Sequence, residues 1–320
     1  MSGIIAGGLA QSAANTAYLA KGDEIFQRPP VGAWALFSDV VPCEGQFLEL
    51  DTIGPSPIVR ELVGSRRFGA LRAYAKRTRV AAYSTDALEL SRLQVEKDVN
   101  GSVTRRLNDY LSASANFWDK ATTDALLANP VGIDGVALIS ASHPYGFGGN
   151  WSNNAAAALS PSTFASGIAA MSALQLENGE PAGFYPTHLM VGPKNEKMAR
   201  DLCTNPLRPF PVAATGLEAY STVVAATAIQ NGWFQGSIEV VVNKRMVGAT
   251  NESGWLLMDL SRPGVRPMIV GEAMAPRAVV VDDPGSEPML QRSNYAYYVE
   301  GYAAISGYAP HCIYGTMTGS

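Results

Sequence analysis

Side chains that commonly carry out chemistry are few and scattered along this sequence. The three histidines, His143, His188 and His311, stand singly, and none has a second histidine or a cysteine at the spacing of metal ligands. We therefore interpret all three as structural residues and predict no metal site. His143 precedes Pro144 in a glycine-rich segment, where we expect its imidazole to hydrogen-bond the backbone of a turn.

Two pairs of carboxylates have a spacing that a general acid and base could use. Asp282 and Asp283 are adjacent, and Glu96 and Asp98 are two residues apart, but both pairs lie in charged segments where solvated carboxylates are the common case. The sequence also lacks the GxxxxGK phosphate loop and the GxSxG serine elbow, and the glycines at 146–149 lack the spacing of a dinucleotide site. It predicts a chain that is not an enzyme and binds no cofactor.

The strongest charge feature is a basic segment, residues 60–79, RELVGSRRFGALRAYAKRTR. It holds seven Lys or Arg and one acid, a net charge of +6, so the rest of the chain carries −10 within the total of −4. Nucleic acid, an acidic membrane surface, or the acidic body of another copy of the chain would suit such a segment. Phe68 and Tyr74 could stack on bases, yet the acidic remainder favours another copy. The predicted contact residues between copies are Arg60, Glu61, Arg66, Arg67, Arg72, Lys76, Arg77 and Arg79.

The composition supports contact between copies. Charged residues make up 16% of the 320 residues, where a typical soluble domain has about 25%, so much of the surface is expected to be shared. The three widely spaced cysteines are typical of a reducing compartment. The N-terminus lacks the basic residue and apolar core of a signal peptide, and no run approaches ~18 apolar residues. We expect a cytosol-like location and no membrane span.

The basic segment needs elements that support it. Residues 1–50 contain three prolines and predict an extended arm with a short helix near 13–19. Residues 51–92 predict a long two-stranded excursion whose tip lies near the glycines of 64–69. An isolated hairpin is only marginally stable in water, so this excursion needs a surface to lie on.

A long helix is predicted next, over residues 102–128. Its apolar side chains recur three and four apart, it begins at a Gly-Ser cap, and Asn129-Pro130 ends it after about 26 residues. A second helix is predicted over 161–177, with Ser160 as its N-cap and Pro161 in its first position.

The remaining segments predict a mixture of helix and strand, followed by mostly strand. THLMVGPKNEKMARDLC predicts strand, turn and helix, and GSIEVVVNKRM predicts another strand. Further strands are predicted at WLLMDL, PMIVGE, RAVVVDD and NYAYYVEGYAAISGY. We expect these late strands to return to the long helix, so that the middle of the chain forms a second lobe.

The order of these segments resembles the major head protein of Mu-like tailed phages over roughly residues 50–315. In that family an R-E-x-x-G-x-R segment precedes a strand pair that ends in E-x-D-x-x-G and leads into the long helix. Here ISASHP follows the helix, and WLLMDLSRPGVRPMIV is similar to the family's tryptophan-initiated strand with Ser-Arg-Pro. The matching positions are Arg60, Glu61, Gly64, Arg66, Glu96, Asp98, Gly101 and Trp255–Val270.

The resemblance implies an α+β fold of the Hong Kong 97 (HK97) capsid type. The N-terminal arm and the last segment, ISGYAPHCIYGTMTGS, match the family loosely or not at all. The implied parts are an N-terminal arm (1–50), an extended β-hairpin loop (51–92), a peripheral domain with the spine helix 102–128 (93–139), an axial domain (140–252), and peripheral return strands with the C-terminus (253–320).

The resemblance also implies a function, that of the major capsid protein of a tailed double-stranded DNA phage or prophage. Copies would self-assemble as hexamers and pentamers into an icosahedral head, in the cytoplasm of the host bacterium, and end in the virion. The implied partners are other copies, a separate scaffolding protein, a portal, and packaged DNA held without sequence-specific contacts. Two alternatives stay open: an encapsulin-like compartment shell, and a soluble nucleic-acid-binding protein that uses residues 60–79.

Overall fold

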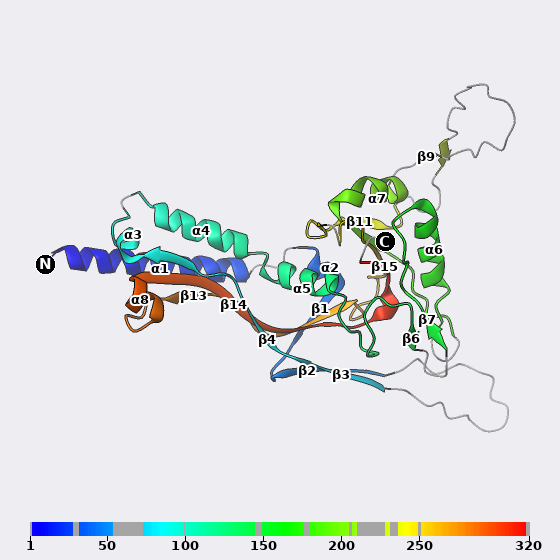
Figure 1. Ribbon diagram of the computed structural model, residues 1–320, viewed down its shortest axis with the longest axis horizontal. Helices are drawn as coiled ribbons and strands as arrows, with labels where there is room; N and C mark the ends of the chain where they lie inside the picture. The colour runs from blue at the N-terminus through cyan, green and yellow to red at the C-terminus, as the bar shows by residue number, and fades with distance from the viewer. Residues whose placement is uncertain are drawn as a thin grey trace. The chain divides into compact units, whose positions relative to one another are not determined.

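The computed structural model describes residues 2–27, 32–53, 73–98, 100–144, 149–175, 180–204, 207–209, 228–230, 236–248 and 251–317. The chain divides into two compact units (Figure 1). Unit 1 consists of Met1–Glu49, Arg77–Ala125 and Ile269–Ser306, and unit 2 consists of Leu50–Lys76, Leu126–Met268 and Gly307–Ser320. Each unit is therefore assembled from three segments that lie far apart in the sequence.

The helices and strands within the described ranges occur mostly in runs of one type along the chain. The helices are α1 (Ser2–Phe26), α2 (Trp34–Phe37), α3 (Arg92–Glu96), α4 (Ser102–Ser114), α5 (Phe117–Leu127), α6 (Pro161–Ser172), α7 (Glu196–Cys203) and α8 (Glu287–Arg292), with 3-10 turns η1 (Pro193–Asn195) and η2 (Pro310–Cys312). The strands are β1 (Ser38–Pro42), β2 (Phe47–Ile53), β3 (Ala73–Arg79), β4 (Ala81–Ser84), β5 (Leu88–Ser91), β6 (His143–Pro144), β7 (Asn150–Trp151), β8 (His188–Val191), β9 (Leu207–Pro209), β10 (Ala228–Gln230), β11 (Glu239–Val242), β12 (Trp255–Met258), β13 (Met268–Val281), β14 (Asn294–Gly307) and β15 (Ile313–Thr316).

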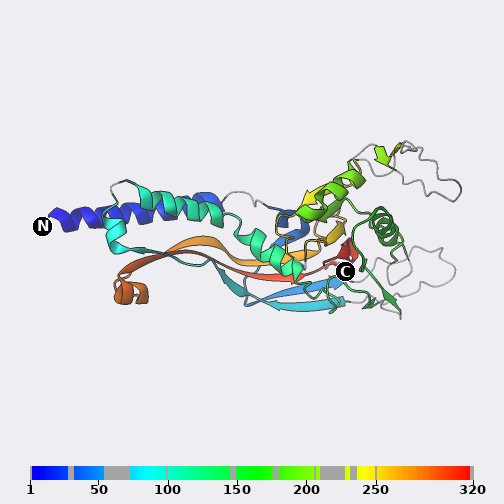
Figure 2. The same ribbon diagram turned by 45° about the horizontal axis from the view of Figure 1, so that its top comes forward.

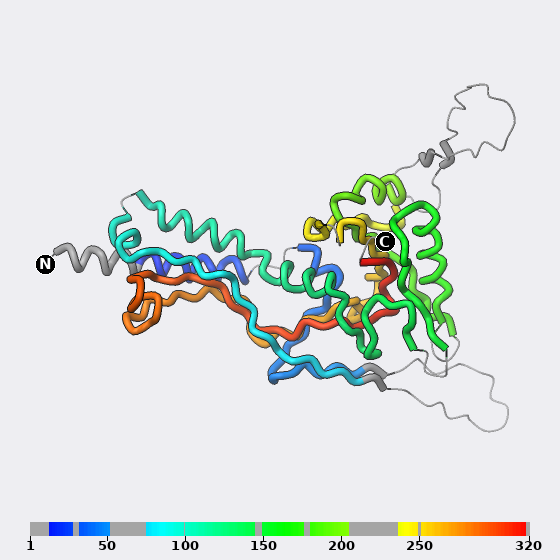
Figure 3. The backbone as a smooth tube through the Cα atoms, in the orientation of Figure 1, coloured from blue at the N-terminus to red at the C-terminus, as the bar shows by residue number. Residues whose placement is uncertain are grey.

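Unit 1 is built around a sheet with the strand order β1-β13-β14-β4, in which β5 also pairs with β14. The 14-residue strands β13 and β14 form its centre (Figure 3). β14 is antiparallel to both of its short partners, with Glu300 opposite Ser84 and Asn294 opposite Ser91. One long strand therefore joins β4 and β5 into a single sheet.

Helices α1 and α4 pack on one face of this sheet (Figure 2). Their buried side chains include Tyr18, Leu107 and Leu111, which contact the tyrosines of β14. The Tyr18 and Tyr297 rings meet edge to face with centroids 5.2 Å apart. A Cβ at Gly22 would lie 2.5 Å from the Cβ of Ala278, so the missing side chain lets α1 approach β13 closely. The core of unit 1 thus lies between these helices and the sheet.

Unit 2 contains a four-stranded sheet in the order β11-β8-β12-β15. β8 and β11 are parallel, and β12 is antiparallel to both of its neighbours. Helices α6 and α7 pack on one face of it, where Phe164 and Leu202 join the buried side chains of Leu189, Trp255 and Leu257. The alternation of side chains along each strand brings these residues to the same face.

Two helices differ from the sequence prediction. The predicted helix over 102–128 is two helices, α4 and α5, because the hydroxyls of Ser112 and Ser114 bond back to the carbonyls of Asn108 and Tyr110 and weaken the helical ladder at this point. The short helix expected near 13–19 is the 25-residue α1, since no proline interrupts residues 2–26. The predicted cap of α6 is confirmed: the Ser160 hydroxyl accepts from the Thr163 N–H.

The strand predictions also need correction at two places. Strands β2 and β3 pair as a separate two-stranded ribbon, but β4 and β5, which the prediction placed in the same excursion, belong to the sheet of unit 1. The tip of the excursion lies outside the described residues. PMIVGE and RAVVVDD form one strand, β13, because the fixed φ of Pro276 is compatible with extended backbone.

The strand at Trp255 lies in a different sheet from the other late strands. β12 pairs with β8 and β15 in unit 2, whereas β13 and β14 lie in unit 1. The predicted return to the long helix therefore applies to residues 269–306 and not to the whole segment after 253. None of the described helices has the length and apolar character that a membrane crossing requires.

Candidate functional site

Strand β3 carries the described part of the basic segment. Lys76, Arg77 and Arg79 lie on it, and the pleat sends Arg77 and Arg79 to an exposed face while Lys76 points to the half-buried face. The structure therefore brings two of the predicted contact residues together and separates the third from them. The other predicted contact residues, which lie outside the described residues, are Arg60, Glu61, Arg66, Arg67 and Arg72.

Arg77 already has partners within its own chain. Its Nε lies 3.4 Å from Oε1 of Glu49, and its guanidinium lies 3.8 Å from the ring centroid of Phe47. Both partners come from β2, the strand paired with β3. Because both members of the ion pair are mostly exposed, the pair stabilises the fold by only about 0–1 kcal/mol. Arg77 can therefore exchange Glu49 for a carboxylate of another copy at little cost.

Lys76 makes contacts of a different kind. Its ammonium group donates to the backbone carbonyls of Val131 and, at 3.2 Å, Gly307. Burial lowers the pKa of Lys76 below its ordinary value, and the nearby negative charge of Asp134 opposes this shift. Carbonyl acceptors and a nearby carboxylate compensate the charge in place of water. Lys76 is therefore engaged within unit 2.

Arg79 is exposed at the end of β3 and has no side-chain partner among the residues that the structure describes. It borders a shallow depression whose walls include Gly45, Val80, Ala273 and Tyr302. A cation beside an apolar depression is suited to bind a side chain that carries a carboxylate at the end of an apolar stem. Of the three predicted residues on β3, Arg79 is thus the one whose charge is not already engaged within the described part of the chain.

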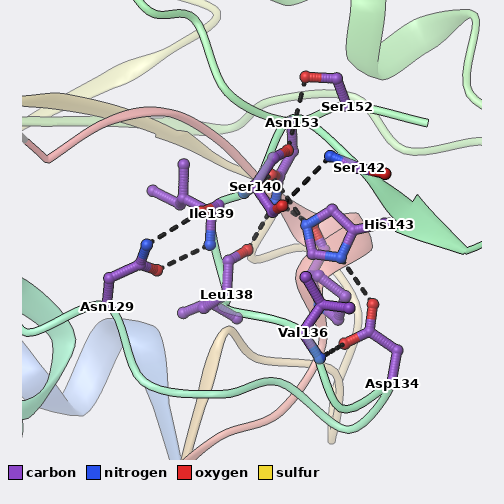
Figure 4. A network of polar contacts seen from close by, with 11 residues as sticks. Asn129, Asp134, Val136, Leu138, Ile139, Ser140, Ser142, His143, Ser152 and Asn153 are labelled. Atoms are coloured by element: carbon purple, nitrogen blue, oxygen red, sulfur yellow. Dashed lines mark hydrogen bonds and ion pairs between the residues drawn. The ribbon is translucent and has the colours of Figure 1, made fainter. Parts of the chain in front are cut away.

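His143 lies in a buried network of polar side chains in unit 2 (Figure 4). Its Nδ1 is 2.6 Å from Oδ2 of Asp134, and its Nε2 is 3.0 Å from Oδ1 of Asn153. The prediction of a contact with turn backbone was therefore wrong, because the acceptors are side chains. These side chains in turn bind the backbone, so His143 holds the turn indirectly.

The orientation of the Asn153 amide is fixed by three backbone groups. Its Nδ2 donates to the carbonyls of Leu138 and Pro310, at 2.7 and 3.1 Å, and its Oδ1 accepts from Ser140 N–H at 2.8 Å. The atom that faces Nε2 of His143 is consequently an acceptor. Nε2 must then carry a proton and donate to Asn153, whatever the state of Nδ1.

Asp134 faces the other ring nitrogen. Burial by itself raises the pKa of Asp134, but hydrogen bonds from His143 and from the Val136 N–H, together with the positive charge of histidine, leave that pKa below its ordinary value. The side chain is only 7% exposed. An ionised carboxylate can only accept, so Asp134 acts as the acceptor toward Nδ1 of His143. The His143 ring thus bridges the Asp134 carboxylate and the Asn153 amide oxygen.

Flat side chains extend this network toward the C-terminal segment. The His143 ring stacks on Trp151 at 4.5 Å, and Trp151 stacks on His311 at 4.7 Å. Phe184 follows at 6.3 Å, and the guanidinium of Arg262 lies 4.2 Å from the Phe184 ring. The stack joins four separate segments of unit 2. We assign it a structural role.

The remaining histidine also makes a local contact. Burial lowers the pKa of His188, and Glu239, 3.5 Å from its Nε2, opposes that shift. Across the described residues, no group of three or more His, Cys, Asp and Glu side chains is placed to hold a metal ion.

The carboxylate pairs hold local structure. Glu96 accepts from Arg92 Nε at 2.6 Å, and Asp98 accepts from the N–H groups of Ser102 and Val103 at the start of α4. Asp282 accepts from Asn15 of α1, and Asp283 accepts from the N–H of Gly285 in a turn. Helix α4 begins at the predicted Gly-Ser pair, with Gly101 as its N-cap, but the side-chain acceptor for its first N–H groups is Asp98, which the sequence did not point to.

The WLLMDLSRPG segment is held by hydrogen bonds between its side chains and the backbone of unit 2. Trp255 is fully buried and donates through Nε1 to the carbonyl of Ala157. Asp259 accepts from the backbone and hydroxyl of Ser261, and Arg262 donates to the carbonyls of Ala182 and Gly183. These residues shape unit 2, which explains a recognisable motif without any catalytic role.

Other residues that matter here had no signal in the sequence. Glu49 and Phe47 lie 28 and 30 positions before Arg77, and Asn153 is one of many asparagines. Asp134, followed by Gly135, had the signature of a turn and nothing that pointed to His143. Only the pairing of strands and the closure of the turn bring these side chains together.

Comparisons with solved structures give matches to phage particles. A chain from Microbacterium phage Oxtober96 aligns with a TM-score of 0.52 at 10% identity, over 92% of this chain and 93% of that one, which shows a shared fold. A chain from the capsid of bacteriophage JBD30 decorated with minor capsid protein trimers aligns with a TM-score of 0.49 at 10% identity, over 90% of this chain. This chain spans 64% of the length of that JBD30 chain.

Sequence comparisons complete the assignment. No curated protein sequence matches this chain. The family model for the phage capsid protein matches residues 73–313, which is 241 of the 320 residues and includes β3, both helices α4 and α5, the His143 network and β14. The chain therefore belongs to the phage capsid protein family and is a protein of the phage shell.

Proposed function

We propose that the chain is the major capsid protein of a tailed double-stranded DNA phage or prophage, of the Mu-like type and with the HK97 fold. Its copies would form hexamers and pentamers that close into an icosahedral head around the genome. The observation that carries this proposal is the ribbon of β2 and β3, which belongs to neither large sheet and presents a basic segment in an otherwise acidic chain. Such a ribbon needs a surface to lie on, and a neighbouring copy supplies one.

The domain assignment is part of the same proposal. We assign residues 1–50 to the arm, 51–92 to the extended loop except for β4 and β5, which join the sheet of unit 1, 93–139 and 253–320 to the peripheral domain, and 140–252 to the axial domain. The sheet and helices of unit 1 support a peripheral domain, and those of unit 2 support an axial domain. The pairing of β12 with β8 favours moving β12 into the axial domain.

The strength of such a shell would come from repetition. Each exposed ion pair contributes about 0–1 kcal/mol, so no single arginine of the basic segment can hold two copies together. Closed symmetry repeats every contact in every copy, and the low content of charged residues leaves apolar surface to bury at each contact. Weak individual contacts also allow misplaced copies to dissociate.

The proposed partners follow from this assembly. They are other copies of the chain, a separate scaffolding protein, a portal, and double-stranded DNA enclosed without sequence-specific contacts, with assembly in the host cytoplasm. Particles isolated from infected or induced cells should protect DNA of defined length from nuclease. Particles that protect an enzyme and no DNA would instead identify a compartment shell.

Charge reversal at the tip of the basic segment tests the contact between copies. We expect the Arg66→Glu/Arg67→Glu variant to fold normally, by circular dichroism and thermal melting, yet to form no closed particles in negative-stain electron micrographs. The reason is that reversed charges would repel the acidic surface of a neighbouring copy. The matched control is Arg105→Glu/Arg106→Glu, which makes the same change of charge on the exposed face of α4.

Each outcome is informative. Particles from the control and none from the tip variant support the proposed contact. Normal particles from the tip variant would show that these arginines do not join copies. A chain that stays monomeric in every condition while binding DNA tightly and with strong salt dependence would contradict the capsid function itself.

A further inference from the structure

Lys76 is the described residue where the basic segment meets the rest of unit 2. It was predicted to contact another copy, but its ammonium group is directed at the carbonyls of Val131 and Gly307. Gly307 is suited to this place because a Cβ there would lie 2.7 Å from the Val131 carbonyl oxygen. The two carbonyls can therefore approach each other and share one cation.

The Val131 carbonyl belongs to a tight turn that runs to Ala137. The ends of this turn form an antiparallel bridge, and the N–H of Gly132 donates to the carbonyl of Val136 at 2.6 Å. Asp134 lies at its tip and accepts the N–H of Val136. Beyond the bridge, the Asn129 side chain donates to the Ile139 carbonyl and accepts its N–H (Figure 4). At the tip, Gly135 N–H donates to the Gly132 carbonyl and Ile133 N–H to the Tyr308 carbonyl, and Asp134 adds the side-chain contact that links this turn to His143.

His143 holds that tip from the side. Its ring bridges Asp134 and Asn153, and Asn153 in turn bonds the carbonyls of Leu138 and Pro310. The groups near this pair are Lys76 on the Asp134 side and His311 beyond Trp151. A continuous set of hydrogen bonds and ion contacts thus runs from Asn153 through His143 and Asp134 to the turn that receives Lys76.

We propose that His143, acting through Asp134, is a positioning residue for the ribbon of β2 and β3. It holds the turn 131–137 in the shape that receives Lys76, and Lys76 thereby fixes strand β3, the last part of the basic segment. Only the role of this ribbon in assembly rests on the proposed function. The anchoring itself is a property of the isolated subunit. It removes Lys76 from the predicted contacts between copies and leaves that role to the arginines.

Hydrogen–deuterium exchange on the unassembled subunit tests the anchor. In Lys76→Met we expect backbone exchange to rise about tenfold or more in both β3 and residues 131–137, which corresponds to the loss of hydrogen bonds to a charged group. Lys76→Arg keeps the charge and the donors, so it should restore most of the protection. The matched control is Lys97→Met, which removes an exposed lysine elsewhere and should leave both segments unchanged.

A second pair of variants tests the role of His143. In His143→Gln we expect exchange to rise in residues 131–139 and also in β3, although no atom of β3 has been changed. Asp134→Asn can keep every hydrogen bond with a neutral ring, because its amide can donate to Nδ1 while Nε2 still donates to Asn153. It should therefore protect β3 far better than His143→Gln does.

Two results would overturn the inference. One is Lys76→Met with unchanged exchange in both segments, and this outcome is decisive even if His143→Gln fails to fold. The other is His143→Gln with faster exchange in 131–139 and none in β3, which would make the network merely local. Electron microscopy of the same proteins reports separately on particle formation, so a failure of the capsid proposal would not be mistaken for a failure of the anchor.

Discussion

Lys76 and Arg77 are neighbours with opposite surroundings, because consecutive side chains of a strand point to opposite faces. Lys76 reaches the backbone carbonyls of Val131 and Gly307, while Arg77 lies over Phe47 and beside Glu49 in solvent. A count of charges in the segment treats the two as equivalent. At the scale of single residues, the strand's pleat decides which cations are available to another copy.

The hydrogen bonds that Asp98 accepts at the start of α4 lead to a prediction at the residue scale. Burial alone would raise the pKa of Asp98, but hydrogen bonds from the backbone of Val103 and Ser102 and from the Ser102 hydroxyl leave it below the ordinary value. Its contribution to stability is therefore complete above the unfolded pKa of about 3.9 and is lost as the pH falls through the folded pKa. Asp98→Asn should melt at a lower temperature than the wild type at pH 7.

The pH dependence distinguishes this cap from a general effect of the substitution. The difference in melting temperature between Asp98→Asn and the wild type should shrink as the pH falls from 5 to 2, since the wild-type carboxylate then also loses its charge. Calorimetry across this range measures it. A difference that stays constant with pH would show that the carboxylate charge does not support α4.

The sequence identified part of the residue-scale picture. It selected His143 from the three histidines and the basic segment from the whole chain, because both stand out by type or by local charge. It could not supply Asp134, Asn153 or Glu49 as partners, since each is an ordinary polar residue until the chain folds. Which side chains become partners depends on the tertiary fold, and the spacing of residues along a single sequence does not reveal it.

At the scale of elements, α1 is attached to its sheet by two buried tyrosine hydroxyls. Tyr18 donates to the carbonyl of Tyr298 at 3.1 Å, and Tyr297 donates to Asn15 Oδ1 at 2.8 Å. Burial raises the pKa of Tyr18 far above its ordinary value and that of Tyr297 to about 12. The neutral hydroxyls are thus favoured by folding. Their contribution is complete below the unfolded pKa of about 10 and is lost as the pH rises through the folded values.

Tyr18→Phe/Tyr297→Phe tests this attachment. At pH 7 the double variant should be less stable than the wild type by roughly 1–3 kcal/mol, the loss of two buried hydrogen bonds. Because phenylalanine does not ionise, the variant should lose less stability than the wild type between pH 9 and 12. Urea unfolding at a series of pH values measures both effects. Parallel pH profiles would exclude the tyrosines as the alkaline-sensitive groups.

The close packing at Gly315 leads to a prediction about the sheet of unit 2. It lies in β15 at φ +153°, and a Cβ there would be 2.1 Å from the carbonyl oxygen of Trp255 on β12. Backbone on one of the two strands would have to move, so Gly315→Ala should cost about 3 kcal/mol or more in unfolding free energy. The control is Gly285→Ala, whose Cβ would meet its nearest atom at an ordinary 3.5 Å and should change stability by less than about 0.5 kcal/mol.

Element types were easier to predict from the sequence than their ends and partners. The Ser160 cap, the end of α5 at Leu127, two residues before Asn129, and the strands at 188, 255 and 294 follow from local signals. Asn129 has a φ of +53°, which asparagine tolerates better than most residues. The break between α4 and α5 comes from serine hydroxyls that bond back to the helix, whereas the sheet membership of β4 and β12 depends on competition with distant strands. Periodicity within a segment carries no information on that competition.

At the scale of the molecule, the chain passes between the two units five times, at residues 49, 76, 125, 268 and 306. Unit 1 needs β14, and the sheet of unit 2 needs β15, although both units also use residues from the first half of the chain. Neither unit is a continuous stretch that could be excised. The two units are therefore one product of the whole sequence.

A truncated chain tests this dependence. We expect a protein that ends at Ser293, and so lacks β14 and β15, to show no cooperative melting in either unit and to be digested rapidly by trypsin. One central strand, β14, is lost from the sheet of unit 1 and an edge strand, β15, from the sheet of unit 2, which exposes the buried faces of both. Full-length protein under the same digestion is the control. A stable fragment corresponding to unit 2 would contradict this expectation.

The late arrival of β14 and β15 has a consequence for synthesis on the ribosome. A nascent chain holds most of both units long before it holds the strands that complete them, so it cannot present finished surfaces while it is still being translated. Both units gain their complete surfaces only after β14 and β15 have been synthesised. If copies assemble as proposed, partial chains on crowded polysomes would therefore add no defective members to a growing shell.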